Sequence, residues 1–259
     1  MKRAYVDIPE GQMHYRYAGS GEPIICLHIS GSGSDEYDKV GDLLADRFKV
    51  YALDLMGMYF SDPPPRLYNM HEHANTVIEF MDALSIEKAI IAGTCGGSNL
   101  ATRIAFNWPE RVSKLVVMQP VYMPHLGDMH DRRANFHPIQ YNDDGSYLLE
   151  FWKRIDKYKY PPEINMLRAL DQIQSGPEYS EIIHEAMFDD ANMADFYPHL
   201  KMPVTVLRFE NYDAPESPYA QAVADMIPGA KLDTIRDANI YDGRSNPHKV
   251  ADMLRKHLT

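Results

Sequence analysis

The sequence has 259 residues, of which 45% are hydrophobic, and its formal net charge is −11 at pH 7. This length and apolar content allow one large domain, or a domain with an insertion, around a buried core. A negative charge of this size repels phosphate, so we expect no nucleic-acid partner. No apolar run approaches the ~20 residues of a membrane span, and the N-terminus lacks the apolar stretch of a signal peptide. We therefore expect a cytoplasmic protein with no membrane contact.

Strand and helix patterns alternate through the first 120 residues. In chain order we expect strands at 4–8, 13–17 and 24–27, a helix at 37–48, a strand at 49–54, a helix at 73–84, a strand from 89, a helix from 99 and a strand at 114–119. Such alternation predicts an α/β fold with a mostly parallel, doubly wound sheet. Strand patterns return at 203–209 and 231–235, with helices at 219–226 and 247–258.

The segment between these two parts has a different character. Residues 121–200 contain no strand-like run, and helical patterns occur at 147–158, 164–173 and 179–187. The segment is too long for an ordinary connection and too periodic for disorder. We interpret it as a helical cap inserted into a core formed by residues 1–120 and 201–259.

A turn after the strand at residue 89 carries the strongest chemical signal. Gly93-Thr94-Cys95-Gly96-Gly97 has the form G-x-C-x-G, a nucleophile elbow with cysteine in place of serine. Glycines are needed there because only residues without a Cβ let strand and helix approach so closely. A thiol at a helix N-terminus ionises more readily than a serine hydroxyl. The pattern predicts a reactive Cys95; the alternative is a tight turn with a buried structural cysteine.

Further motifs extend the pattern over nearly the whole chain. Residues 26–31 resemble an L-H-G-x-x-G oxyanion loop, and residues 54–62 resemble a D-x-R-G-x-G-x-S-D segment. With the elbow, these motifs resemble the α/β-hydrolase superfamily, in the capped branch that contains esterases, C–C hydrolases, lactonases and dehalogenases. The resemblance implies an oxyanion hole formed by the backbone N–H of Gly96 with that of Ile29 or Ser30.

The other catalytic positions of the family are replaced. Its acid position falls on Tyr212, with Asp213 next to it, and its histidine position falls on Ile240. Without that base, hydrolysis of an acylated Cys95 should be slow, because general base catalysis contributes about 10²–10⁴-fold. We therefore favour elimination, isomerisation or cyclisation of a small apolar carbonyl compound. In this reaction Tyr212 or Asp213 moves a proton, and neither a metal nor an organic cofactor takes part.

Two other functions stay open at this point. A base from His28 or from the cap would make the chain a cysteine-dependent esterase, thioesterase or lactonase, and a pocket without chemistry would make it a small-ligand binding protein. For His28, the resemblance first implies a structural role in ordering the oxyanion loop. We expect the substrate pocket to involve Ile240, Tyr122, His125, His137 and Trp152. The sequence leaves the oligomeric state undetermined.

Overall fold

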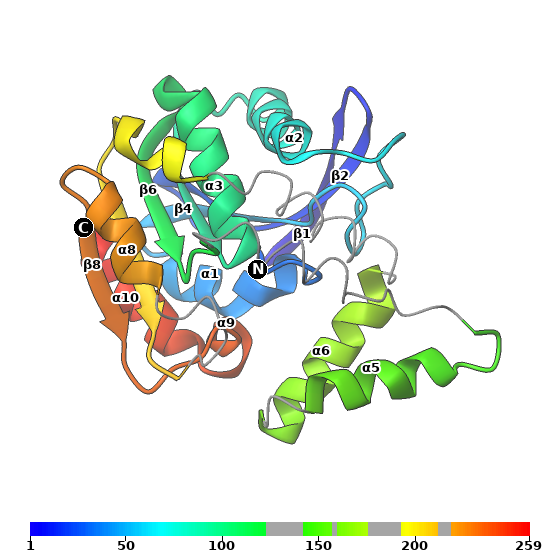
Figure 1. Ribbon diagram of the computed structural model, residues 1–259. Helices are drawn as coiled ribbons and strands as arrows, with labels where there is room; N and C mark the ends of the chain where they lie inside the picture. Colours follow the sequence, from blue (N-terminus) through cyan, green and yellow to red (C-terminus); the bar gives the residue numbers. More distant parts are fainter. Residues whose placement is uncertain (123–141, 157–159, 176–192, 212–218) are drawn as a thin grey trace.

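The computed structural model describes residues 1–122, 142–156, 160–175, 193–211 and 219–259 (Figure 1). An eight-stranded sheet with the order β1-β2-β4-β3-β5-β6-β7-β8 crosses the molecule. Its strands are β1 (Lys2–Ile8), β2 (Gly11–Ala18), β3 (Glu22–Leu27), β4 (Phe48–Leu53), β5 (Ala89–Thr94), β6 (Val112–Met118), β7 (Val204–Phe209) and β8 (Lys231–Ile235). Strand β2 is antiparallel to β1 and β4, and all other neighbouring strands are parallel. The predicted α/β-hydrolase fold is confirmed.

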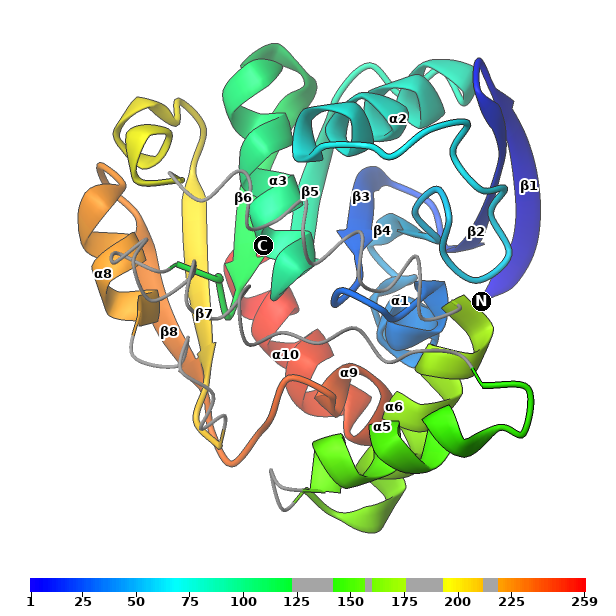
Figure 2. The same ribbon diagram turned by 45° about the vertical axis from the view of Figure 1, so that its right-hand side comes forward.

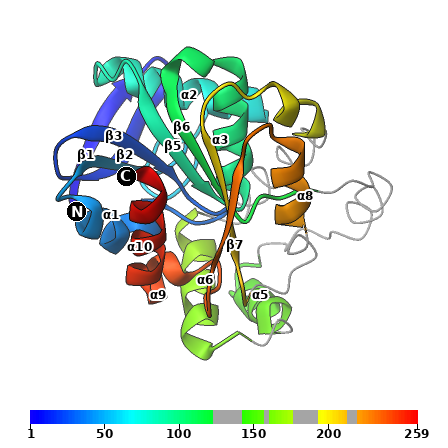
Figure 3. The ribbon, with the colours of Figure 1, turned by 90° about the vertical axis from the view of Figure 1, so that its left-hand side faces the viewer.

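Helices cover both faces of the sheet, as Figures 2 and 3 show. They are α1 (Asp38–Leu44), α2 (Met70–Ala83), α3 (Gly96–Asn107), α5 (Ser146–Asp156), α6 (Pro162–Ser175), α8 (Tyr219–Met226), α9 (Asp242–Ser245) and α10 (Pro247–Leu258), with 3₁₀ turns η1 (Ser34–Tyr37), η2 (Pro109–Arg111), η3 (Met193–Asp195) and η4 (Tyr197–His199). Helices α2, α3 and α8 contribute to the core on one face, and α1 and α10 to the core on the other.

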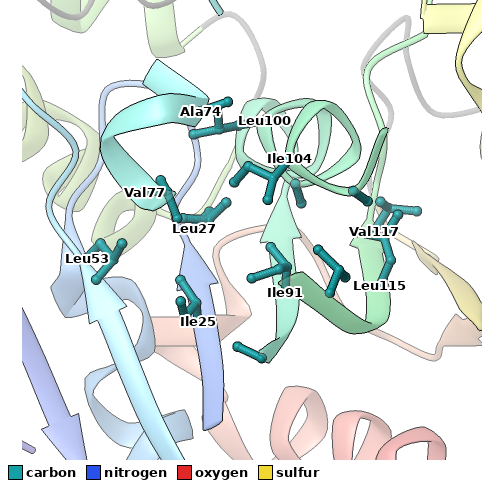
Figure 4. Packing of buried hydrophobic residues seen from close by; sticks show 14 of the residues in the cluster. Ile25, Leu27, Leu53, Ala74, Val77, Ile91, Leu100, Ile104, Leu115 and Val117 are labelled. Atoms are coloured by element: carbon teal, nitrogen blue, oxygen red, sulfur yellow. The ribbon is translucent and has the colours of Figure 1, made fainter. Parts of the chain in front are cut away.

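Burial on both faces explains the continuous apolar runs of the central strands. Along β3, Ile25 and Leu27 enter the core under α2 and α3, whereas Ile24 and Cys26 enter the core on the opposite face. Figure 4 shows the first of these cores, where Leu27 lies with residues of α2 and α3. All six residues of β5 are buried. The elbow that follows β5 is therefore anchored at the centre of the sheet.

Element boundaries differ from the predictions where tertiary contacts or caps decide them. The helix expected at 37–48 ends at Leu44, because Phe48 already pairs with Glu22 in the β3–β4 ladder. Helix α2 begins at Met70, three residues earlier than expected, because Asn69 and Glu72 form a capping box. Cys95 alone makes the turn between β5 and α3, so α3 begins at Gly96 rather than at 99.

Helices α5 and α6 lie within the predicted cap segment and pack against each other (Figure 1). Ser175 of α6 donates from Oγ to the carbonyl oxygen of Gly31 at 3.2 Å, so α6 reaches the loop after β3. The helix expected at 179–187 lies outside the described residues. Among the helices that the structure describes, none combines the length and the apolar composition that crossing a bilayer requires.

Candidate active site at the elbow

Cys95 has the strained backbone of a nucleophile elbow. Its φ of 53° and ψ of −117° lie in a region that costs a residue with a side chain about 1–3 kcal/mol. A Cβ added at Gly93 would lie 2.1 Å from the carbonyl oxygen of Gly97, and one added at Gly97 would lie 2.2 Å from that of Leu27. The two glycines are therefore required by the close approach of β5, α3 and β3.

The thiol of Cys95 is partly exposed and takes no part in a disulfide. Its position is the N-cap of α3, where the first helical N–H groups have no acceptor within the helix. These groups and the helix dipole favour negative charge at the helix start. Gly96, the first helical residue, lines a cavity at this point, as does Ser30 of the oxyanion loop. The structure thus brings Gly96 and Ser30 to the same cavity, and their role as an oxyanion hole stays a prediction.

His28 is held by the backbone on both sides of its ring. Its Nδ1–H donates to the carbonyl oxygen of Ile29 at 2.8 Å, and its Nε2 accepts from the N–H of Leu55 at 3.3 Å. Burial lowers the pKa of this imidazole, which is consistent with a neutral ring. Because both nitrogens are used, His28 orders the loop and is not placed to accept a substrate proton. This corrects its inclusion among the catalytic candidates.

The N–H of Ile29 is also committed. It donates to Oε2 of Glu36 at 2.8 Å in a buried environment. Burial raises the pKa of Glu36 to about 8. Since the N–H of Ile29 points to this carboxyl group, the expectation that it contributes to an oxyanion hole is wrong for this structure. Ser30 is left as the candidate partner of Gly96.

The segment that resembles D-x-R-G-x-G-x-S-D has a structural explanation. Oδ1 of Asp54 accepts from the N–H of Ser34 at 2.5 Å, and Oδ2 lies 2.7 Å from Nδ1 of His14. Ser61 donates from Oγ to the carbonyl oxygen of Asp54 at 2.6 Å. These buried bonds join the loops after β3 and β4 to β2, and they fix the shape of the sheet end where Cys95 lies.

Ile240 occupies the place of the family's histidine, but it belongs to the core. It is 3% exposed and lies in the cluster on the α1 and α10 face, against which Cys95 and Tyr241 also pack. Ile240 is not among the residues that line the cavity beside Gly96, and its place in the substrate pocket stays a prediction. Burial raises the pKa of the Tyr241 phenol, and Tyr160, Cys95 and Asp171 raise it further, while Arg168 lowers it.

Tyr241 is thus an ionisable group that packs, like Cys95, against this cluster, and sequence reasoning missed it. Its position directly after Ile240, next to the place of the family's histidine, was the available signal. The guanidinium carbon of Arg168 lies 5.6 Å from the centre of the Tyr241 ring, and the ring of Tyr160 lies at the same centroid distance. Both residues come from the segment 121–200, so this segment contributes side chains to the surroundings of Tyr241.

The remaining predicted residues lie elsewhere. Tyr122 packs edge-on against Tyr197 and Tyr219, at ring distances of 6.2 and 5.9 Å, and Trp152 lies partly buried on α5. Neither lines the cavity beside Gly96. The other four residues, which are Tyr212, Asp213, His125 and His137, lie outside the described residues.

The cavity beside the elbow is small, with room for about one water molecule. Its lining residues come from the oxyanion loop, the loop after β4, α2 and the start of α3: His28, Ser30, Leu55, Met70, His73, Gly96, Gly97 and Leu100. The described part of the chain contains no group of three or more His, Cys, Asp or Glu side chains placed to hold a metal ion.

Comparison with known protein families matches residues 22–153, half of the chain, to the family described as alpha/beta hydrolase fold. The chain belongs to this family. Solved α/β-hydrolase structures show the same fold along the full length. A hydrolase from Pseudomonas aeruginosa has a TM-score of 0.82 at 18% identity, covering 99% of this chain and 98% of its own. An esterase from Thermogutta terrifontis has a TM-score of 0.82 at 21% identity, covering 100% and 98%.

Curated relatives are similar over a shorter stretch. A 2-hydroxy-6-oxo-6-phenylhexa-2,4-dienoate hydrolase from Comamonas testosteroni is 33% identical over 123 residues, which are 44% of this chain and 42% of the relative. Haloalkane dehalogenase 2 from Mycobacterium bovis is 29% identical over 121 residues, which are 46% of this chain and 42% of the relative. The similarity thus spans less than half of these relatives' length. The chain is an α/β-hydrolase-fold protein whose relatives are hydrolases.

Proposed function

We propose that this α/β-hydrolase-fold enzyme acts on a small, largely apolar carbonyl compound at Cys95 and catalyses a proton transfer instead of hydrolysis. The observation that carries the proposal is Ile240, which is buried in the core at the position of the family's histidine. A hydrolase of this design needs a base there to activate water for release of the acyl group. Elimination, isomerisation and cyclisation proceed without an acyl intermediate.

In this proposal the backbone N–H groups of Gly96 and Ser30 bind the carbonyl oxygen of the substrate. Hydrogen bonds to that oxygen stabilise the negative charge that develops when a proton leaves the neighbouring carbon. Tyr241, which packs against the same cluster as Cys95, supplies a phenol donor, and burial raises its pKa further above neutrality. The carboxylate of Asp213 accepts the proton from carbon or Tyr212 donates one in its place, so that either residue moves a proton, and the cap of residues 121–200 shields the reaction from water.

The test is the intact mass of the protein after incubation with activated esters and thioesters, with Cys95→Ala as the control. The proposal expects a slowly formed, stable adduct that depends on Cys95, or no adduct, and no rapid release of product. With a stable adduct, Ile240→His should speed release toward the 10²–10⁴-fold range of general base catalysis. Rapid release without an adduct in the wild type would contradict the proposal.

A cysteine-dependent hydrolase is the second candidate, and the names of the relatives favour it. Two matched proteins are named as a hydrolase and a dehalogenase. Under this candidate a base from outside the described residues, such as His125 or His137, replaces the missing histidine. Rapid turnover that is lost in Cys95→Ala and in one of these histidine variants would establish it. A protein that neither reacts with the esters nor converts carbonyl compounds, but still binds them, would be a small-ligand binding protein.

A further inference from the structure

The carboxyl group of Glu36 is buried next to the elbow, and the proposed reaction does not use it. Glu36 lies in η1, the 3₁₀ turn that follows the oxyanion loop, and is 2% exposed. Its Oε2 accepts the N–H of Ile29 from that loop at 2.8 Å, and its side chain forms a hydrogen bond with that of Thr94. Since Thr94 directly precedes Cys95, one carboxyl group joins the oxyanion loop to the elbow.

Thr94 extends this contact into a chain of hydroxyl groups. Its Oγ1 lies 2.6 Å from the phenol oxygen of Tyr37, which donates to the carbonyl oxygen of Leu27 at 3.3 Å. A protonated Glu36 can donate to Thr94, which then donates to Tyr37. An ionised Glu36 only accepts, so Tyr37 donates to Thr94 and Thr94 to the carboxylate. The same arrangement of side chains therefore accommodates both states of the carboxyl group.

The groups around Glu36 favour its uncharged state near neutral pH. Burial is the main cause that raises its pKa to about 8. Arg244 of α9 lowers this pKa, and Asp171 of α6 raises it. Tyr37 of η1 and Cys26 of β3 also face the carboxyl group, and Glu36 contributes to raising the pKa of both. Glu36 is thus mostly protonated at pH 7 and ionises a little above it.

We propose that Glu36 is a positioning residue of this site: its carboxyl group holds the oxyanion loop against the elbow, and its ionised form opposes negative charge at Cys95 or on a bound carbonyl oxygen. The part that concerns the carbonyl oxygen rests on the proposed function. A carboxylate in contact with the residue before Cys95 repels a thiolate or an oxyanion at the elbow. A protonated carboxyl group makes the same contacts without this repulsion.

The test measures alkylation of Cys95 by iodoacetamide, a neutral reagent that reacts with the thiolate, by intact mass from pH 6 to pH 10. Cys26 is buried, so the first alkyl group on the native protein reports on Cys95. Glu36→Gln keeps an acceptor and a donor but cannot ionise. The matched control is Glu22→Gln, which removes an exposed carboxyl group at the start of β3, the end of that strand far from the oxyanion loop.

Below pH 7 the wild type and Glu36→Gln should react at equal rates. Above pH 8 the rate of the wild type should lag, and Glu36→Gln should react about threefold faster, as expected when a nearby charge moves a thiol pKa by roughly one unit. Glu22→Gln should follow the wild type throughout. In ¹³C NMR of the wild type, the Glu36 carboxyl signal should titrate near pH 8, and the Ile29 amide signal should shift with it.

Thr94→Val supplies a second test that does not depend on how Glu36→Gln folds. It removes the hydroxyl group that lowers the pKa of Glu36, so the Glu36 carboxyl should titrate at a higher pH. The pH at which alkylation of Cys95 begins to lag should rise with it. An alkylation profile that stays in place while the Glu36 titration moves would overturn the proposal.

Two further results would overturn it and leave the proposed function standing. One is identical alkylation profiles of the wild type and Glu36→Gln. The other is a Glu36 carboxyl that titrates near its ordinary value of 4.5. Rapid turnover of esters would contradict the proposed function instead, and it would not alter these titrations.

Discussion

At the scale of single residues, the elbow combines a strained residue with glycines that have no substitute. Gly97 is helical, and in an exposed helix alanine would be preferred over glycine by about 1 kcal/mol. Here a Cβ would lie 2.2 Å from the carbonyl oxygen of Leu27 and 2.5 Å from that of His28, both of which are backbone atoms. The oxyanion loop would have to move to accommodate it.

We predict that Gly97→Ala lowers the free energy of unfolding by about 2 kcal/mol or more and abolishes reaction of Cys95 with activated esters. The matched control is Gly41→Ala in α1, where the atoms nearest to the added Cβ belong to the flexible side chain of Met1. That variant should be close to neutral. Urea unfolding and intact mass check both effects, and equal stabilities of the two variants would contradict the steric argument.

The lowered pKa of His73 leads to a prediction about how the free energy of unfolding depends on pH. Its pKa is lowered from 6.5 to about 4 in the folded protein, so the unfolded chain binds the extra proton more readily between these values. Stability should therefore fall as the pH drops from 6.5 toward 4, by up to about 3 kcal/mol from this residue. His73→Leu should not show this loss of stability at low pH. At pH 7 it should be about 1 kcal/mol more stable than the wild type, because leucine buries no unpaired polar atom.

The measurement is urea unfolding at several pH values for the wild type, His73→Leu and the exposed control His71→Leu. A ring that is hydrogen-bonded in solution would give the opposite sign at pH 7, because the substitution would then remove a favourable bond.

At the scale of elements, an arginine joins the segment 121–200 to the core. Nη1 of Arg244, on α9, lies 2.8 and 2.9 Å from the two carboxylate oxygens of Asp171 on α6. Its Nη2 donates to Oγ of Ser32 at 2.6 Å and to Asp35 at 2.8 Å. The hydroxyl group of Tyr59 also contacts Asp171. Helix α6 is thus attached to the loops that form the rim of the site.

We predict that Arg244→Met lowers the free energy of unfolding by about 3 kcal/mol, because it leaves the largely buried Asp171 without its cation. Hydrogen exchange in α6 should increase more than exchange in α3. Lys249→Met is the control, since Lys249 pairs with the exposed Asp237 and should change stability by less than about 0.5 kcal/mol. Unchanged exchange in α6 would show that other contacts hold this helix.

The sequence predicted the elements that local pattern and chain order determine, and missed those that depend on long-range contacts. The elbow was predictable because its glycines and its strand-to-helix turn are adjacent in the chain. The bond from Ile29 to Glu36 could not be foreseen, since only the folded loop brings the two groups together. The unsatisfied ring of His73 is likewise visible only once α2 is packed beside α3. Tyr241 is the exception, because it directly follows Ile240, which the sequence had already assigned to the position of the family's histidine.

At the scale of the whole molecule, the two cysteines report on different events. Reaction of Cys95 reports on access to the elbow, and reaction of Cys26 reports on unfolding of the sheet. Cys95 is partly exposed at the elbow, whereas Cys26 is fully buried in β3 at the centre of the sheet, where burial raises its pKa. We predict that the native protein reacts quickly with a thiol reagent at one cysteine only. In Cys95→Ala, the slow reaction of Cys26 should follow global unfolding and accelerate with urea. Fast labelling of Cys26 without denaturant would contradict the two-sided burial of β3.

The order of the strands also bears on how activities can diversify in this chain. The elbow follows β5, near the centre of the sheet, while the family's acid and base positions come in the chain after β7 and β8, the last two strands of the sheet. Substitutions after these two strands leave the ladder around β5 intact, so mutation can exchange the side chains there while the elbow keeps its shape. One lineage can therefore pass from one reaction class to another through variants that all remain folded.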